Sequence, residues 1–171
     1  IQGPNDPILR PVAANKMDYE VEVAMVIGEE GKNISEDKAQ DYVFGYCIVN
    51  DVSERSWQKE RGGQWIKGKS IAGPCGPYLV TKDEIKDINN LNLSLDVNGE
   101  RRQTGNTKRM IFNFNFLISH ISQFMTLYPG TIITTGTPAG TAMEMDVPKF
   151  LQPGDKLSLK VDQLGEQNHI V

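Results

Sequence analysis

The sequence predicts a strand-rich α+β domain. Three observations predict it: short β-branched or alternating segments recur along the chain, one segment alone has a long amphipathic helical pattern, and strands and helices do not alternate regularly. A regular alternation is typical of a doubly wound parallel sheet, so a Rossmann-type fold is not expected. The 171 residues, 39% of them hydrophobic, suffice for one domain with a sizeable core.

The N-terminal half is predicted to hold three strands and two short helices. Residues 1–17 are predicted to be irregular, because they contain three prolines and the turn pair Asn5-Asp6. The segment 18–28 alternates at first and then becomes wholly apolar, which predicts a strand that enters the core. Ser35, followed by two acidic residues, predicts a short helix to about residue 41. A buried strand over 42–50, a polar helix over 53–61 and a strand over 77–81 follow.

The C-terminal half is predicted to be a hairpin, one good helix and further strands. Residues 91–97 alternate strictly, and Asn98-Gly99 is the strongest hairpin signal in the chain. Apolar residues at spacings of three and four predict a helix over 114–127. The remaining elements are a return strand over 100–103, a strand over 131–135, a tight loop over 136–140, a strand over 157–161 and a tail at 168–171 that pairs with the sheet. No linker follows Asp18, so a single domain over 1–171 is expected.

Composition excludes several function classes. The net charge is −4, with 22 acidic against 18 basic residues, so a nucleic-acid partner is not favoured. No apolar run approaches 18 residues, so no membrane span is expected. The two cysteines, Cys47 and Cys75, are too few for a disulfide scaffold and indicate a reducing, cytoplasmic compartment. Cys47 is predicted to be inert in a buried strand and Cys75 to lie in a loop.

Acidic residues give the first indication of chemistry. Asp18, Glu20 and Glu22 lie on one face of the predicted strand, because side chains alternate with period two. The strand continues into apolar sequence, so burying these carboxylates without compensation would cost several kcal/mol. A divalent cation would compensate them, and an all-oxygen set suits Mg²⁺, Mn²⁺ or Ca²⁺ rather than Zn²⁺. The alternative for the acids alone is a solvated strand face.

Three further features are weak by themselves. Asp51 follows a buried strand directly and is a candidate third ligand, although it could instead cap the helix that begins near Ser53. Lys67 and Lys69 could stabilise an oxyanion beside a metal, or form an exposed basic turn. The loop 135–140 offers backbone N–H groups and a hydroxyl, or is an ordinary turn.

The histidines carry no recognisable catalytic arrangement. His120 lies within the predicted amphipathic helix, and His169 is two residues from the end. The chain has no nucleophile elbow of the G-x-S-x-G type.

In chain order, however, the motifs are specific. They are GPNDPI at the start, DYEVEVAMVIG at 18–28, VFGYCIVNDVSERSWQ at 43–58, IKGKS at 66–70, GPYLVTKDEI at 76–85, LDVNGERRQTGNT at 95–107, MIF at 110–112 and PGTIITTGTPAG at 129–140. From Gly3 to Val171 the chain resembles the catalytic C-terminal domain of the fumarylacetoacetase (fumarylacetoacetate hydrolase) family. The resemblance implies a β-roll of mixed strands, a homodimer and one Mg²⁺ or Mn²⁺ per subunit.

The resemblance also implies roles for individual residues. Glu20 and Glu22 match the family's E-x-E metal ligands, and Asp51 completes the set. Gln58 matches a glutamine that holds the keto-acid portion of the substrate. Lys69 matches a lysine that contacts the substrate oxygen and acts in catalysis, and Thr137 matches a further substrate contact.

The implied reaction is hydrolysis of a C–C bond in a 2,4-diketo acid, such as an acylpyruvate or a diketo-deoxy sugar acid, through an enolate that the metal stabilises. Lys69 would add positive charge beside the developing oxyanion. The same site could instead serve an isomerase or decarboxylase of a 2-oxo or unsaturated dioic acid. A third alternative is a homologue that binds an oxo acid without turnover.

The chain departs from the family pattern at three places. Ser56 stands where an aspartate is common, which leaves the pairing of Arg55 open. Residues 71–75 are about two residues shorter than usual, and Thr141-Ala142 replaces Val-Gly. The chain begins at Ile1, and the resemblance implies a preceding segment with a lid that carries the general base, so we expect roughly the first third of the parent protein to lie outside this sequence.

Overall fold

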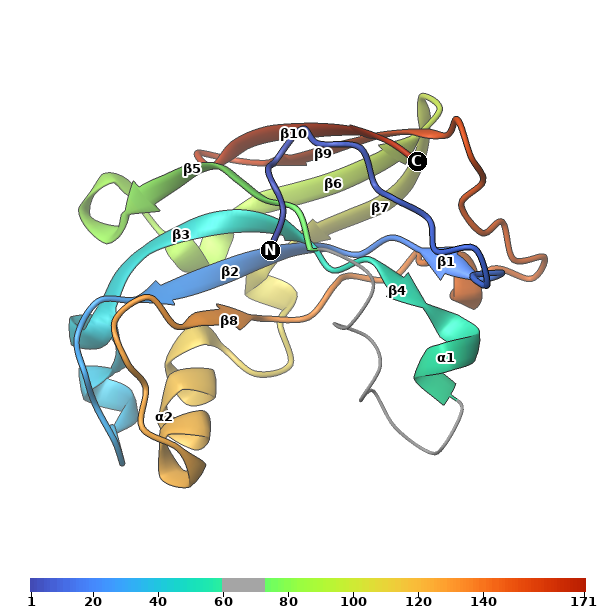
Figure 1. Cartoon of the computed structure of the whole chain (residues 1–171). Coiled ribbons are helices and arrows are strands. Elements are labelled where there is room, and N and C mark those ends of the chain that lie inside the picture. Colours follow the sequence, from blue (N-terminus) through green and yellow to red (C-terminus); the bar gives the residue numbers. More distant parts are fainter. Residues whose placement is uncertain (60–72) are drawn as a thin grey trace.

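The structure, a computed structural model, describes residues 1–59 and 73–171. It contains two four-stranded sheets and a two-stranded ribbon (Figure 1). Sheet I has the strand order β5-β3-β2-β8, sheet II has the order β10-β9-β6-β7, and β1 pairs with β4. In the described ranges the named strand pairs are antiparallel, and a single parallel bridge joins Gln2 to Pro74. The strand-rich α+β fold predicted from the sequence is confirmed.

Sheet I contains three strands of the N-terminal half and one strand, β8, of the C-terminal half. Its members are β2 (Val21–Ile27), β3 (Val43–Asn50), β5 (Cys75–Thr81) and β8 (Ile132–Thr134). Every residue of β2 is buried. Burial of its apolar second half was predicted, and Glu22 in its first half is buried as well. The strand expected over 18–28 is divided, because β1 (Met17–Asp18) leaves the sheet to pair with β4 (Ser53–Glu54).

Sheet II consists of two hairpins, β6–β7 and β9–β10, joined by the pairing of β6 with β9. It contains β6 (Asn92–Val97), β7 (Glu100–Asn106), β9 (Lys156–Val161) and β10 (Gly165–Ile170). Asn98 and Gly99 both have positive φ, 52° and 79°, which is the turn that Asn-Gly favours between two strands. The expected pairing of the tail is confirmed, and it starts earlier, at Gly165.

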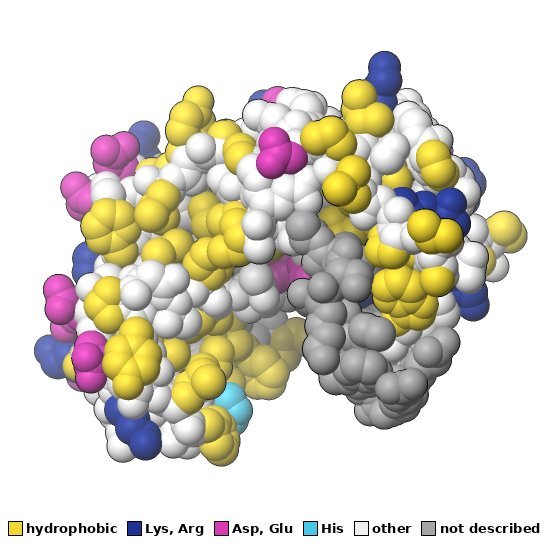
Figure 2. Space-filling view, in the orientation of Figure 1, with side chains coloured by type: hydrophobic (Ala, Val, Ile, Leu, Met, Phe, Trp, Pro, Cys, Tyr) yellow, Lys and Arg dark blue, Asp and Glu magenta, His cyan; other side chains and the backbone are white. Residues whose placement is uncertain are grey.

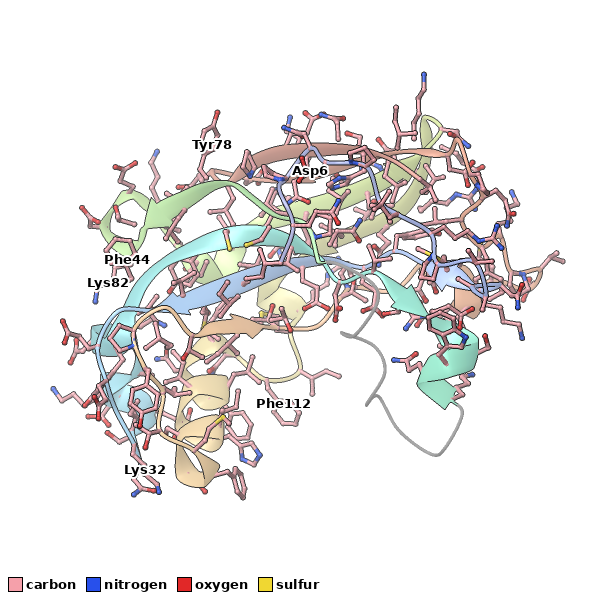
Figure 3. All side chains as sticks on the ribbon, in the orientation of Figure 1. Asp6, Lys32, Phe44, Tyr78, Lys82 and Phe112 are labelled. Atoms are coloured by element: carbon pink, nitrogen blue, oxygen red, sulfur yellow. The ribbon has the colours of Figure 1, made fainter. Side chains whose placement is uncertain are left out.

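The main core lies between the two sheets. The inward faces of β2 and β6 contribute Val21, Val23, Met25, Leu93 and Leu95 to one buried cluster. In β6 and β9 every second side chain is apolar and buried, so the apolar residues of each strand form its buried face, as the strand period of two requires. Aromatic side chains outside this core, Phe44, Tyr78 and Phe112, project outward (Figure 3).

The α-helices are short. α2 (Phe114–Phe124) begins where Asn113 accepts a hydrogen bond from Phe116 N at 2.8 Å. It ends three residues before the predicted position, because the chain becomes extended at Met125 and Leu127 pairs with Gly31. α1 (Arg55–Lys59) starts two residues later than predicted, because Ser53 and Glu54 form β4. Among the described helices, none combines the length and apolar character needed to cross a membrane.

In residues 1–59 and 73–171 the remaining helical segments are 3₁₀-helices: η1 (Glu36–Tyr42), η3 (Lys82–Glu84), η4 (Ile88–Asn90), η5 (Thr107–Arg109) and η6 (Ala142–Glu144). The helix predicted after Ser35 is η1, a 3₁₀ rather than an α-helix. The other four were not predicted, since a single turn is too short to show a hydrophobic period.

Leu95 tests the packing of the two sheets. It is fully buried on β6, between Gln103 of β7 and Leu159 of β9. Leu95→Ala should lower the free energy of unfolding in urea by about 3 kcal/mol, because it leaves a cavity in a closed core. Ser94→Ala, on the other face of the same strand, is the matched control. An equally small effect of both substitutions would contradict this core.

Candidate metal centre

Three acidic residues meet where β2 begins and β3 ends. The two strands are antiparallel and Val21 pairs with Asn50, so the residues just outside these ends are neighbours. Glu22 belongs to β2, Glu20 precedes it, and Asp51 follows β3. One carboxylate oxygen from each of the three lies within 4.8 Å of the others. The structure therefore brings together the three residues that the sequence proposed as metal ligands.

The cluster is held by the backbone around it. Asp51 N donates to Glu20 O at 2.9 Å, and Glu20 N donates to the Asn50 side-chain oxygen at 3.1 Å. Glu20 is 7% exposed and Glu22 is 2% exposed, whereas Asp51 is partly exposed. Two carboxylates of the cluster are thus nearly buried, and solvent reaches the cluster on the side of Asp51.

Arg55 of α1 connects this cluster to its surroundings. Its Nη2 donates to Glu20 Oε1 at 2.6 Å, its Nε donates to Asp18 Oδ2 at 2.8 Å, and its Nη1 donates to Gln58 Oε1 at 3.0 Å. Burial would lower the pKa of Arg55, but the charges of Glu20 and Asp18 outweigh burial and raise it above its usual value. Arg55 therefore stays charged and pairs with these two acids, which answers the question that Ser56 raised.

Asp18 has a different role from the other two acids of the predicted strand. It is fully buried and accepts hydrogen bonds from Ala142 N at 2.8 Å and Met143 N at 3.1 Å, in addition to that from Arg55. Asp18 thus fixes the start of η6. It is not a member of the carboxylate cluster.

The loop 135–140 contacts the cluster from β8. Gly136 N donates to Glu22 Oε2 at 2.8 Å. The Thr137 hydroxyl donates to Val21 O at 2.9 Å and accepts from Gln103 Nε2 at 2.8 Å. Its proton is therefore used within the protein, and a substrate contact by Thr137 would use the remaining lone pair of the hydroxyl or the main chain.

Gln103 is a site residue that sequence reasoning missed. Its fully buried amide accepts from Val21 N at 3.0 Å and donates to Thr137 Oγ1 and, at 2.7 Å, to Pro138 O. It therefore attaches the loop to the strand that carries Glu22. The sequence pattern contains no signal for it, because a regular two-residue hairpin would pair Gln103 with Ser94. A register shift between Leu95 and Asp96 places Gln103 opposite Leu95 instead, on the inward face, where a buried polar side chain needs partners.

The other predicted substrate contacts divide into two groups. Gln58 lies on α1, beside Arg55, so it is near the cluster through that hydrogen bond. Lys69, with Lys67, lies outside the described residues.

Glu54, rather than Asp51, caps α1. The Glu54 carboxylate accepts hydrogen bonds from Trp57 N at 2.8 Å and Ser56 Oγ at 2.6 Å, and from Asn15 N and Lys16 N on the other side. The alternative prediction, that Asp51 caps this helix, is therefore wrong, because Glu54 caps it. Burial would raise the pKa of Glu54, but these hydrogen bonds outweigh it and place the pKa below its usual value.

A cleft of about 480 Å³ lies beside the loop 135–140. Glu22 and Val23 point to opposite faces of β2, and Val23 lines the cleft, so the cleft and the carboxylates lie on opposite sides of the strand. Much of its wall is apolar and includes Met110, Ile111 and Phe112.

The sequence as a whole matches the family model described as the C-terminal domain of fumarylacetoacetate (FAA) hydrolase, over residues 1–171. The chain belongs to the fumarylacetoacetate hydrolase family. A relative from Burkholderia cenocepacia, provisionally named a hydrolase, is 52% identical over 170 residues, which is 98% of this chain and 60% of the relative. The chain thus spans about 60% of the length of the curated relatives that it matches.

Solved structures of this family share the fold. Fumarylacetoacetate hydrolase from Exiguobacterium antarcticum has a TM-score of 0.93 and 40% identity, over 99% of this chain and 61% of that one. Maleylpyruvate hydrolase from Sphingobium sp. SYK-6, in complex with manganese(II) and pyruvate, has a TM-score of 0.86 and 32% identity, over 99% and 60%. 2-Hydroxyhepta-2,4-diene-1,7-dioate isomerase from Mycobacterium marinum has a TM-score of 0.89 and 38% identity, over 99% and 64%. The family therefore includes both hydrolases and isomerases.

Glu54 gives the site a pH-dependent element. Its carboxylate has a lowered pKa in the folded state, so its contribution to stability is present above the unfolded-state value of about 4.3 and is lost as the pH falls through the folded-state value. Glu54→Gln should lower the free energy of unfolding by about 2 kcal/mol at pH 7. The difference from the wild type should shrink as urea titrations are repeated at lower pH.

Glu30→Gln is the matched control, since Glu30 is exposed. It should show no such convergence with the wild type. A difference between Glu54→Gln and the wild type that stays constant down to about pH 3 would contradict the capping role of the Glu54 carboxylate.

Proposed function

We propose that this chain carries the metal site of an enzyme that hydrolyses a C–C bond in a 2,4-diketo acid, either an acylpyruvate or a diketo-deoxy sugar acid. The observation that carries the proposal is the cluster of Glu20, Glu22 and Asp51, with one oxygen of each within 4.8 Å of the others. The manganese and pyruvate bound to the related maleylpyruvate hydrolase support it.

The donor set fits a hard divalent cation. Three carboxylates bring a formal charge of −3 to a site where Glu20 and Glu22 are nearly buried, and the Arg55 guanidinium is shared with Asp18. Oxygen donors of this kind suit Mg²⁺ or Mn²⁺, and Ca²⁺ would need further oxygen ligands. A bound divalent ion would supply Lewis acidity that polarises a substrate carbonyl.

Residues of the chain prepare the ligands before any cation arrives. Arg55 fixes one oxygen of Glu20, and Gly136 N fixes one oxygen of Glu22. Because both carboxylates are oriented by hydrogen bonds, less conformational freedom is lost on binding.

The substrate contacts belong to the same proposal. Gln58 Oε1 accepts from Arg55, so the Nε2 end of this amide is the one that can donate to a substrate oxygen. We assign Lys69 the role of stabilising the developing oxyanion. Thr137 is assigned to the substrate side of the loop that Gln103 holds.

The histidines of the described ranges do not supply the base that activates water. His120 stacks on Phe116 and contacts Phe124 edge to face, all three on α2. His169 Nδ1 lies 3.2 Å from Asp6 O, and its Nε2 lies 3.1 Å from Gln167 Oε1. The proposal therefore assigns the base to a residue outside the described part of the chain. The expected homodimer and cytoplasmic location stay predictions.

Isomerisation is the second candidate function, because isomerases of similar fold exist in the family. The same carboxylates and Lys69 would serve it, since both reactions pass through an enolate. The two differ in whether water is consumed, so pyruvate release and double-bond migration in an unsaturated dioic acid distinguish them.

Glu22 provides the decisive variant. In the full protein, Glu22→Gln should weaken Mn²⁺ binding in calorimetry by at least about 100-fold and abolish metal-dependent release of pyruvate from a panel of acylpyruvates and diketo-deoxy sugar acids. The substitution keeps the size of the side chain and removes one of the three charges. Glu30→Gln, which removes an exposed charge, should bind Mn²⁺ and turn over like the wild type.

Two results would contradict the proposal. Mn²⁺ binding that Glu22→Gln leaves unchanged would exclude the cluster as the metal site. Metal binding with neither pyruvate release nor double-bond migration for any substrate of the panel would favour a binding protein without turnover.

A further inference from the structure

The two cysteines of the chain lie in contact. Cys47 is on β3 and Cys75 is the first residue of β5, and their Sγ atoms are 3.3 Å apart. The sequence placed Cys75 in a loop, which is wrong, and gave no reason to bring it next to Cys47. The cause is the pairing of β3 with β5, two strands that lie 24 residues apart in sequence and side by side in Figure 1.

Strand register explains the contact. Val49 pairs with Cys75, and Cys47 is two residues before Val49, so both thiols lie on the same face of sheet I. The register of this pair of strands shifts between Tyr46 and Ile48, so Cys47 has no direct partner in the ladder to β5. On the side of Cys47 that faces β5, the neighbouring side chain is that of Cys75.

The environment of the two thiols is apolar. Small hydrophobic side chains of the same face, Ala24, Val26 and Val49, are buried with Cys47, and Cys75 packs against them. Figure 2 shows hydrophobic side chains over β2, β3 and β5, with most charged side chains toward the periphery of this view. No metal-binding group of three or more ligands that includes these thiols is found among the described residues. Two thiols whose sulfurs lie 3.3 Å apart can support redox chemistry between them.

The two thiols are not equivalent. Cys47 is 2% exposed, whereas Cys75 is partly exposed. The contact between the two sulfurs lowers the pKa of Cys75 to about 7, and the same contact, with burial, raises the pKa of Cys47. Cys75 is thus the thiol that an oxidant reaches first, in the thiolate form that reacts. Cys47 is the thiol close enough to react with an oxidised Cys75.

We propose that Cys47 and Cys75 form a reversible disulfide when the protein meets a peroxide. The Cys75 thiolate attacks one peroxide oxygen, the O–O bond breaks, and Cys75 becomes a sulfenic acid while hydroxide leaves and takes up a proton as water. The Cys47 sulfur then attacks the Cys75 sulfur, and the hydroxide that is displaced leaves with the Cys47 proton as a second water. Two electrons pass from the two sulfurs to the peroxide, and a dithiol reductant reverses the change.

The surrounding backbone is already fixed for this bond. Asn50 N donates to Pro74 O at 3.0 Å, and Gln167 Nε2 donates to Ile48 O at 3.0 Å and Gly76 O at 2.8 Å. Hydrogen bonds on both sides of the thiols therefore hold the two strands together. The sulfurs need to approach by a further ~1.2 Å, to a bond of about 2.05 Å.

The disulfide would close a covalent ring around residues 48–74. This segment begins with the end of β3 and contains Asp51, Arg55 and Gln58. Joining its ends reduces the conformational freedom of the unfolded chain, so oxidation should stabilise the fold. This inference is independent of the proposed reaction, because it requires no bound metal and no substrate.

The test uses the full protein, reduced with dithiothreitol, desalted without air and treated with one equivalent of hydrogen peroxide. We expect loss of two free thiols, a mass decrease of two hydrogen atoms, a Cys47–Cys75 cross-linked peptide and a Tm raised by several degrees. Dithiothreitol should restore the original mass and Tm.

Two variants separate the steps. Cys47→Ser should leave Cys75 as a sulfenic acid that dimedone traps, and Cys75→Ser should leave the Cys47 thiol unmodified under the same treatment. A cross-link between two molecules, a gain of two oxygen atoms on Cys75 without a cross-link, or two thiols that remain titratable would overturn the proposal. A Tm that falls on oxidation would contradict the stabilising role of the bond.

Discussion

The antiparallel pairing of β2 with β3 determines the rest of the site. It places the beginning of one strand against the end of the other, and with them Glu20, Glu22 and Asp51. Apolar residues on both sides of β2 fix this pairing, because a slip of one residue would turn Glu22 into the core and Val23 out of it. The fold thus uses the burial of hydrophobic side chains to force carboxylates together that would otherwise repel each other.

Compensation of these charges organises the neighbouring elements. Arg55 reaches the cluster because Glu54 caps α1 and β4 pairs with β1, and Asp18 holds Arg55 from the other side. The loop after β8 contributes Gly136 N, and Gln103 of sheet II keeps that loop in place. Elements from both sheets therefore converge on a few buried oxygens. Removing one partner of such a network leaves a buried charge without its counterpart, which is far more costly than loss of a surface ion pair.

Much of this was predictable from the sequence, for identifiable reasons. Strands over 18–28 and 91–97 follow from strong patterns, and the Asn98-Gly99 turn follows from residues that tolerate positive φ. Glu20 and Glu22 share a face by strand period, Asp51 was a candidate from its place directly after a buried strand, and the family resemblance joined the three in one set. Features set by tertiary contacts were not predictable: the early end of α2 depends on pairing with Gly31, and the contact of Cys47 with Cys75 depends on a register shift. Asp18 was grouped with the wrong partners because the sequence does not show that the chain leaves the sheet at Tyr19.

The central claim is that the three carboxylates bind one divalent cation. The most direct test is a crystal structure of the full protein grown with Mn²⁺ and oxalate, with data collected at the manganese absorption edge. The account predicts one anomalous peak at about 2 Å from an oxygen of each of Glu20, Glu22 and Asp51, with oxalate completing the coordination. A fully occupied manganese elsewhere, or one whose ligands exclude Glu22, would contradict it.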